Sequence, residues 1–250
     1  MIERFFNKNN TVEALSDKEL NQVLDYKEVI YAFERATYSS IYTIDYEKQT
    51  FEYVSENPLF LCGYSVDQVR EMGYAFYYKN VIHEDLDLLI KINKIGFDFY
   101  ENIPLQDRKL YTISYDFHLK SDYNKKILVN QKLTPVFLSD SGKIWKALCV
   151  VSLSTEKSAG NIKISKKGHN HISYYDLKID KWKSLKSIVL TDRENEIIQL
   201  SIRGFTINDI ASEIFVSPET VKFHRKKLFA KLDVNNMPEA IFYAANNKLL

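Results

Sequence analysis

The segment Ser217–Lys231 combines basic side chains with a single acid in a way that suits contact with a polyanion. It contains five bases and one acid: Lys222, Arg225, Lys226, Lys227, Lys231 and Glu219. Residues 1–154, by contrast, carry 18 basic against 22 acidic side chains. A basic segment in an acidic chain is the electrostatic footprint of a nucleic-acid contact. A solvated helix face has the same composition, so the spacing within the segment has to decide.

Three of these side chains share one face of a helix, because Lys222, Phe223 and Lys226 stand at i, i+1 and i+4. The apolar stripe of the same helix consists of Val221, Leu228 and Leu232. An aromatic ring and two lysines away from that stripe add nothing to a core. They are therefore our candidates for reading base edges in the major groove of double-stranded DNA.

The elements around this face form a helix-turn-helix pattern. Ser217 is a typical N-cap and Pro218 a typical first helical residue, which predicts a helix to about Leu232. Thr206 caps a shorter helix before it, and a three-residue break separates the two. A short helix followed by a longer basic one is the arrangement that places a recognition helix in the major groove.

Two further helices complete the C-terminal pattern. Thr191 and Glu194 form a capping box that starts a helix, and Gly204 suits the left-handed residue that ends it. A fourth helix is predicted over about Pro238–Lys248.

The tail matches L-T-x-R-E-x-E-I … G-x-T-x-x-D-I-A-x-x-I-x-x-S-x-x-T-V-K-x-H … K-L-x-V … E-A over about sixty residues. This pattern resembles the LuxR/GerE-type DNA-binding domain. The resemblance implies an all-α four-helix domain that binds DNA as a homodimer. The family's arginine before "x-E-A" is Met237 here, which puts a phosphate or salt-bridge role at that position in doubt.

Matching positions to the family assigns roles to individual residues. The base-reading positions are Lys222, Phe223 and Lys226. The DNA-backbone positions are Thr206, Thr220, His224, Arg225 and Lys227. The dimerisation surface of the fourth helix is represented by Ile241, Phe242 and Ala245. His224 could equally pack between helices, and Thr191, Glu194, Gly204 and Ser217 are better explained as capping and turn residues than as DNA ligands.

The front half predicts an α+β unit with an antiparallel sheet. A capping box at Ser16 and Glu19 starts a helix to about Tyr38, with Leu20 and Tyr31 on its apolar face. The predicted strands are 40–45, 50–55, 111–119, 127–138 and 144–153, with short helical pieces over 57–78 and a helix over 83–95.

This order, together with "Y-V-S-E-N … L-C-G-Y-S" and "I-H-E-D", resembles a PAS domain over roughly residues 25–154. The resemblance implies sensing, partner binding or dimerisation, with a small-molecule ligand as one option. The cofactor is unknown: Cys62 does not match the flavin-binding motif, and His83 and His118 fit structural roles better than haem ligation. Tyrosine and phenylalanine could line a pocket, although they more often form a core.

Composition limits the remaining classes. No run of about 18 apolar residues occurs and the N-terminus lacks a secretion signal, so we expect no membrane segment and a cytoplasmic bacterial protein. Cys62 and Cys149 are far apart, which argues against a disulfide framework or a metal site. We find no nucleophile–base set and no phosphate-binding glycine loop, so we do not expect an enzyme.

We therefore predict three segments: a PAS-like sensor or dimerisation domain with an N-terminal helix (1–154), a basic connector (155–187) and a LuxR-type helix-turn-helix domain (188–250). The connector carries eight bases against three acids and could form a hairpin of 162–165 with 172–177. The predicted function is transcription regulation. The alternative is a protein-interaction adaptor that contacts a partner such as RNA polymerase without reading DNA.

Overall fold

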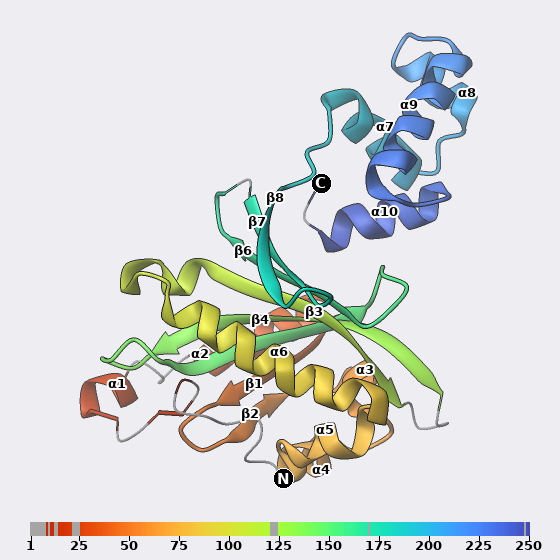
Figure 1. Ribbon diagram of the computed structural model, residues 1–250. Coiled ribbons are helices and arrows are strands. Elements are labelled where there is room, and N and C mark those ends of the chain that lie inside the picture. The colour runs from red at the N-terminus through yellow and green to blue at the C-terminus, as the bar shows by residue number, and fades with distance from the viewer. Residues whose placement is uncertain are drawn as a thin grey trace. The chain divides into compact units, whose positions relative to one another are not determined.

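The structure, a computed structural model, describes residues 9, 11–12, 15–21, 26–120, 125–169, 171–247 and 249–250 (Figure 1). Its contacts divide the chain into two compact units, Met1–Leu185 and Lys186–Leu250. Among the described residues, no helix is both long and apolar enough to cross a membrane.

The N-terminal unit is built on one eight-stranded sheet in the order β2-β1-β5-β4-β3-β6-β7-β8. Its strands are β1 (Ser40–Asp45), β2 (Thr50–Val54), β3 (Tyr111–Lys120), β4 (Lys126–Leu138), β5 (Ile144–Leu153), β6 (Gly160–Lys166), β7 (His171–Asp176) and β8 (Lys181–Lys186). All pairings from β2 through β7 are antiparallel.

Helices cover both faces of this sheet. They are α1 (Asp17–Asn21), α2 (Tyr26–Ala36), α3 (Pro58–Leu61), α4 (Val66–Met72), α5 (Ala75–Asn80) and α6 (His83–Glu101), with a 3₁₀ helix over Leu105–Leu110. Ile30 of α2 packs on Ile41 and Tyr53, whereas Tyr42 belongs to the main core that α3–α6 cover. Because neighbouring strand residues point to opposite faces, every residue of β1 is buried.

The predicted α+β order of two strands, short helices, a longer helix and three strands is confirmed. The expected helix over Ser16–Tyr38 appears as α1 and α2, and residues 22–25 between them lie outside the described part. Its predicted apolar face is wrong: Leu20 and Tyr31 are 48% and 39% exposed, and Ile30 is the buried residue of α2. The spacing of apolar residues in the sequence does not by itself show which side of the helix meets the sheet.

The expected connector, 155–187, contains β6, β7 and β8, and β6 pairs with both β3 and β7. Ser165 pairs with Ile172 within the hairpin that the sequence left open. The domain boundaries at 154 and 187 stay predictions.

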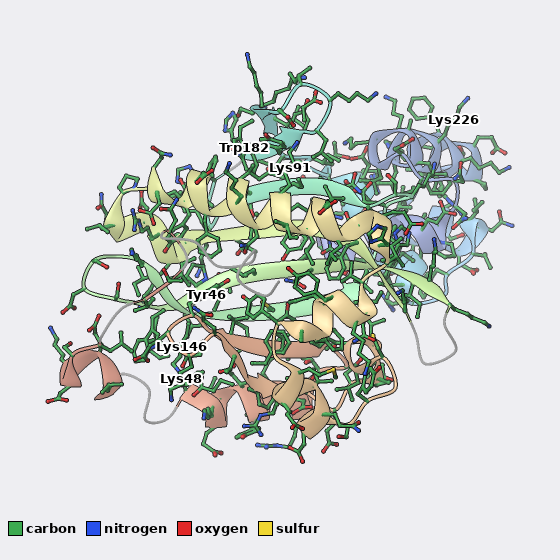
Figure 2. All side chains as sticks on the ribbon, turned by 60° about the horizontal axis from the view of Figure 1, so that its bottom comes forward. Tyr46, Lys48, Lys91, Lys146, Trp182 and Lys226 are labelled. Carbon is green, nitrogen blue, oxygen red and sulfur yellow. The ribbon has the colours of Figure 1, made fainter. Side chains whose placement is uncertain are left out.

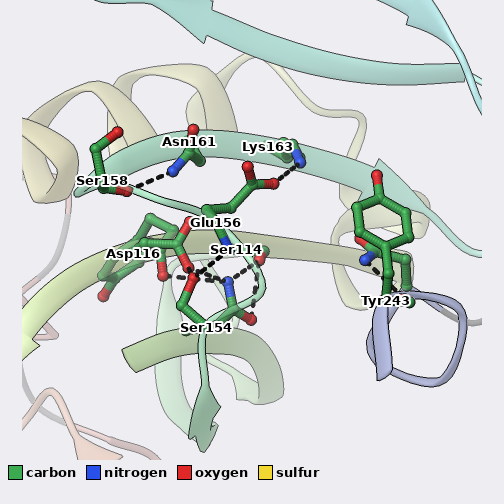
Figure 3. A network of polar contacts seen from close by, with 11 residues as sticks. Ser114, Asp116, Ser154, Glu156, Ser158, Asn161, Lys163 and Tyr243 are labelled. Atoms are coloured by element: carbon green, nitrogen blue, oxygen red, sulfur yellow. Dashed lines mark hydrogen bonds and ion pairs between the residues drawn. The ribbon is translucent and has the colours of Figure 1, made fainter. Parts of the chain in front are cut away.

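A polar network holds β6 beside β3 (Figure 3). Asp116 Oδ1 accepts hydrogen bonds from Ser154 Oγ at 2.8 Å and Asn130 Nδ2 at 3.0 Å. Lys163 pairs with Glu156 at 3.0 Å. These contacts link β3 and β4 to the loop before β6. After that loop, β6 pairs with β3 and continues the sheet.

The C-terminal unit is all-α, as expected. It contains α7 (Asp192–Ile202), α8 (Ile207–Glu213), α9 (Pro218–Leu232) and α10 (Met237–Asn246). One apolar core joins them, centred on Ile197, Ile210, Val221 and Ala240.

Candidate nucleic-acid interface

The start of α9 is fixed by local chemistry. Ser217 Oγ accepts a hydrogen bond from the backbone N–H of Thr220 at 3.1 Å, and Pro218 occupies the first turn. The backbone N–H groups at a helix start attract anions because few of them have partners within the helix. The predicted N-cap and helix bounds are confirmed.

One face of α9 is buried and the other is exposed, as the spacing predicts. The buried residues are Val221, Leu228 and Leu232. Phe223 is 53% exposed and the Lys222 side chain 60%, and Lys226 is exposed as well (Figure 2). The structure thus places the three expected base-reading residues together on one exposed surface, which we call the α9 face.

The five bases of the segment have different surroundings. Lys222 pairs with exposed Glu219 at 3.3 Å, a contact worth little in water. Lys231 instead contacts the carboxylate of Glu194 and donates to the carbonyl of Val189 at 3.3 Å. Lys231 therefore fastens α9 to α7 and does not belong to the α9 face.

Glu194 is the capping residue of α7, and its side chain is only 4% exposed. Burial alone would raise its pKa, but hydrogen bonds from Lys231 and the Thr191 backbone outweigh burial and lower the pKa. The capping interpretation of Thr191 and Glu194 is confirmed by both reciprocal hydrogen bonds.

The expected DNA-backbone residues lie on two helices. Thr206 is exposed and caps α8, accepting from the Asp209 N–H at 3.3 Å. The other four, all on α9, are Thr220, His224, Arg225 and Lys227. Lys227 lies over the Phe223 ring at 4.5 Å, so an expected backbone residue touches an expected base-reading one.

The surroundings of His224 and Arg225 are partly protein and partly solvent. Both are half-buried. The His224 ring lies edge-on to Phe223 at 5.7 Å, and the Arg225 guanidinium lies 5.7 Å from the Phe229 ring. Both alternatives for His224, packing and DNA contact, stay open.

The expected dimerisation residues lie on the outer side of α10. Phe242 is 40% exposed, Ala245 is exposed and Ile241 is half-buried, whereas Ala240 and Ala244 are in the core. Met237, which replaces the family's arginine, is the first residue of α10 and is buried. The position therefore serves the core.

Sequence reasoning missed one feature of this unit. Phe215, in the turn between α8 and α9, is 93% exposed and has φ of 55°. A residue after a helix adopts this left-handed conformation most easily when it is glycine or asparagine. The only signal in the sequence was a phenylalanine where a turn residue would be expected.

For the N-terminal unit, the sequence predicts a structural role for His118 and argues against a metal site. His118 is a strand residue whose ring Nδ1 lies 2.7 Å from Asp85 Oδ2, which also accepts from the His118 backbone at 2.7 Å. The described residues contain no group of three or more His, Cys, Asp or Glu side chains able to hold a metal ion.

Comparison with known proteins identifies the C-terminal unit. The family "Bacterial regulatory proteins, luxR family" matches residues 188–244. The oxygen regulatory protein NreC of Staphylococcus haemolyticus is 42% identical over 62 residues, which are 25% of this chain and 29% of NreC. NreC of Staphylococcus carnosus is 39% identical over 62 residues, again 25% and 29% of the two chains. The chain therefore spans less than a third of these relatives.

Solved structures with similarity include the Vibrio cholerae VqmA dimer, described as a LuxR-type receptor, at 16% identity and TM-score 0.35 over 89% of this chain and 88% of VqmA. A diguanylate cyclase PAS/PAC sensor domain from Marinobacter aquaeolei has 13% identity and TM-score 0.35, over 46% of this chain and 94% of that domain. Residues 188–244 thus match the luxR family of bacterial regulatory proteins, and an α+β unit precedes them in the chain.

Proposed function

We propose that this chain regulates transcription by docking α9 into the major groove of double-stranded DNA. The observation that carries the proposal is the α9 face, on which Lys222, Phe223 and Lys226 are exposed while the opposite side of the helix forms the core. An α-helix fits the major groove, where each base pair presents a distinct pattern of donors and acceptors.

The residues divide into two roles. Lys222, Phe223 and Lys226 contact base edges and therefore set sequence preference. A second group contacts the sugar–phosphate backbone: Thr206, Thr220, His224, Arg225 and Lys227. Phosphate contacts fix the register of a protein on DNA, release counterions and carry no direct sequence information.

Two chains pair through the outer side of α10, where Ile241, Phe242 and Ala245 lie. A two-fold pair presents two copies of α9 to half-sites about one helical turn apart, roughly 34 Å. The target sequence is then expected to be an inverted repeat.

The PAS-like domain supplies the control. We infer that the signal is a small molecule bound inside this domain. Such a molecule can change the DNA affinity only by as much as its own affinities for the two states of the protein differ.

The test is DNA binding by the full chain at several salt concentrations. If about six phosphates are neutralised, the affinity falls about a thousandfold or more between 50 and 200 mM salt. Lys227→Ala should make the affinity fall less steeply with salt, because one phosphate contact is lost. Lys48→Ala, which removes an exposed lysine from the β1–β2 turn, should leave the salt dependence unchanged. Binding that does not vary with salt would contradict the proposal.

One observation favours the adaptor alternative. Phe215, in the turn before α9, is 93% exposed, and aromatic residues are enriched in protein interfaces. If the chain bound RNA polymerase but not DNA, and Phe215→Ala abolished that binding, the adaptor function would replace the proposal above.

A further inference from the structure

The strands that follow β5 carry an excess of basic side chains. The segment 160–186 contains β6, β7 and β8, which we call the β6–β8 ribbon, and has seven lysines against two acids (Figure 1). Both acids are neutralised by lysines, since Asp176 pairs with Lys183 at 2.6 Å and Asp180 pairs with Lys91 of α6. The remaining lysines therefore leave this end of the sheet with a net positive charge.

The seven lysines of the β6–β8 ribbon differ in their surroundings. Lys163 and Lys166 pair with Glu156 and Asp107, acids that lie outside the segment. Four others are exposed and form no ion pair within the described part of the chain; they are Lys167, Lys178, Lys181 and Lys186. A lysine of this kind can neutralise a phosphate without first breaking an ion pair.

The direction of β8 places its last lysine at one end of the ribbon. β8 is the neighbour of β7 in the sheet. Trp182 meets the Tyr175 ring at 5.1 Å and Lys183 lies 5.8 Å from the Tyr174 ring, so later positions in β8 face earlier positions in β7. The two strands are therefore antiparallel, and Lys186 lies at the end of the ribbon where β7 begins.

The turn between β6 and β7 lies at that same end. The His169 N–H donates to the Lys166 carbonyl at 3.2 Å, and the Lys167 N–H donates to the Leu110 carbonyl at 2.9 Å. Gly168 has φ of 78°, and a Cβ added there would meet no atom within 4 Å among the described residues. The turn is thus held in position by hydrogen bonds and is open to solvent.

Four exposed side chains at this end are able to bind phosphate. They are Lys167, His169, His171 and Lys186, which we call the basic tip. Lysine supplies a positive charge, and even a neutral imidazole ring has one N–H that can donate to a phosphate oxygen. No acid occurs in 157–175 or in 181–191, so neighbours in the chain do not repel an anion at the basic tip.

The length of the chain limits how far the basic tip can lie from DNA that α9 binds. The chain enters the C-terminal unit at the end of α9, since Lys231 donates to the Val189 carbonyl at 3.3 Å. Lys222 lies about 14 Å back along the helix axis, and three extended residues from Val189 reach at most about 11 Å to Lys186. Together these lengths are shorter than one turn of DNA, about 34 Å. Phosphates within about one turn of the half-site are therefore within reach.

A weak contact is sufficient under these conditions. Once α9 is bound, a group held by a short connection meets the DNA at an effective concentration in the millimolar range, roughly. Contacts with single phosphates, which could not hold the chain on DNA alone, are occupied at that concentration.

We propose that the basic tip is a second DNA contact, which binds the sugar–phosphate backbone outside the half-site that α9 occupies. This inference rests on the proposed docking of α9 into the major groove. The basic tip contacts phosphates and not base edges, so it adds affinity for any flanking sequence and leaves base preference to α9.

The first experiment measures the affinity of the full chain for a selected DNA site with ten base pairs of flanking sequence on each side. The double variant Lys167→Ala, Lys186→Ala loses two phosphate contacts. Its affinity should therefore fall about tenfold less than that of wild type between 50 and 200 mM salt.

The matched control is the double variant Lys178→Ala, Lys181→Ala. It removes the same charge from exposed positions at the other end of the same ribbon and should leave the salt dependence unchanged. Equal changes in the two double variants would show a general effect of net charge and would overturn the proposal.

The second experiment shortens the DNA to the two half-sites. The basic tip then has no flanking phosphate to bind, so wild type and Lys167→Ala, Lys186→Ala should bind the short duplex equally. Scrambling the flanks of the long duplex should change nothing, because backbone contacts carry no base information. A loss of affinity as large on the short duplex as on the long one would overturn the proposal.

Two other roles for these lysines give different results. Lysines at the edge of a sheet also prevent other chains from pairing with it, in which case Lys167→Ala, Lys186→Ala keeps the full salt dependence and forms higher oligomers. An acidic protein partner predicts loss of binding to that protein, such as RNA polymerase, with unchanged DNA binding. Either result overturns this inference and leaves the proposed function standing, whereas wild-type DNA binding that does not vary with salt contradicts both.

Discussion

Lys231, near the end of α9, forms an ion pair with Glu194 in the first turn of α7. The same carboxylate accepts from the backbone N–H of Thr191 at 2.9 Å, so one buried group both caps α7 and fastens α9 to it. Lys231, one of the five bases in the segment Ser217–Lys231, therefore stabilises the fold of the C-terminal unit.

Glu194→Gln is expected to destabilise the C-terminal unit by about 2 kcal/mol at pH 7, because it removes charge-assisted hydrogen bonds from a buried site. The folded-state pKa of Glu194 is lowered, so its contribution is present above its ordinary value of 4.5 and is lost as the pH falls through the folded-state pKa. Hydrogen exchange of α7 amides across this pH range measures the effect.

Glu196→Gln provides the control, since Glu196 pairs with Arg193 at 2.7 Å on the exposed side of the same helix. It should leave exchange nearly unchanged. Equal protection in both variants and wild type would show that the Lys231 contact does not stabilise the unit.

Lys226→Ala is expected to reduce sequence discrimination by about tenfold while changing binding to random DNA little, because Lys226 is assigned to a base edge. Lys227→Ala should instead weaken binding to both kinds of DNA. Competition binding with a selected site and a scrambled one measures the difference. Parallel losses in the two variants would refute the separate roles.

Local sequence signals predicted the C-terminal unit well. Ser217, Thr206 and Thr191 each cap the helix that the sequence assigned to them, because capping depends on side chains within three residues. Pairing of β6 with β3 joins Ile164 to Ile113, about fifty positions apart, and no local signal specifies such a partner.

The same limit applies to the contact between Phe99 and Trp182 and to the exposure of Phe215. Phe99 and Trp182 meet only because the sheet continues beyond β5, a fact that the composition of residues 155–187 does not contain. The exposure of Phe215 depends on how the chain turns between α8 and α9, which no local pattern specifies. Long-range geometry, which the sequence pattern does not encode locally, accounts for both.

Lys146→Met is expected to destabilise the N-terminal unit by about 3–5 kcal/mol, the cost of leaving a buried charge without its partner. The Lys146 side chain is 4% exposed and contacts Asp45 at 2.8 Å and Glu52 at 2.6 Å. Both tryptophans lie in this unit, so urea unfolding followed by their emission reports on it alone. Lys48→Met, at an exposed lysine, should leave the midpoint unchanged; an equal loss there would contradict the explanation.

Asp116→Asn is expected to stabilise the N-terminal unit at pH 7 by about 1 kcal/mol, because it removes a buried negative charge while the amide oxygen can still accept from Ser154 and Asn130. Burial raises the pKa of Asp116 despite the hydrogen bonds from Asn130 and Ser154. For an acid with a raised folded-state pKa, stability is lost as the pH rises from the ordinary value of 3.8 through the folded-state pKa.

The difference between Asp116→Asn and wild type should therefore shrink at low pH, where the carboxyl group is protonated in both states. Urea midpoints at pH 3, below the ordinary pKa of 3.8, and at pH 7 measure it. A variant less stable than wild type at pH 7 would show that the carboxylate is needed for the contacts with Asn130 and Ser154.

Phe215→Gly is expected to stabilise the C-terminal unit by about 1 kcal/mol, because a left-handed backbone costs a non-glycine residue roughly that much. Its side chain is 93% exposed and so contributes little packing that the substitution could remove. Strain of this kind persists at functional positions, where it is retained for a contact that the folded chain alone does not need.

Thermal unfolding of the C-terminal unit tests the stability, and binding to DNA and to RNA polymerase tests the contact. Higher stability with weaker binding to one partner would identify the surface that Phe215 serves. Gly204, at φ of 87° in the turn before α8, is the matched control: Gly204→Ala should destabilise the unit, since it introduces the strain that Phe215→Gly removes. Lower stability of Phe215→Gly would mean that its ring is held by contacts that its exposure conceals.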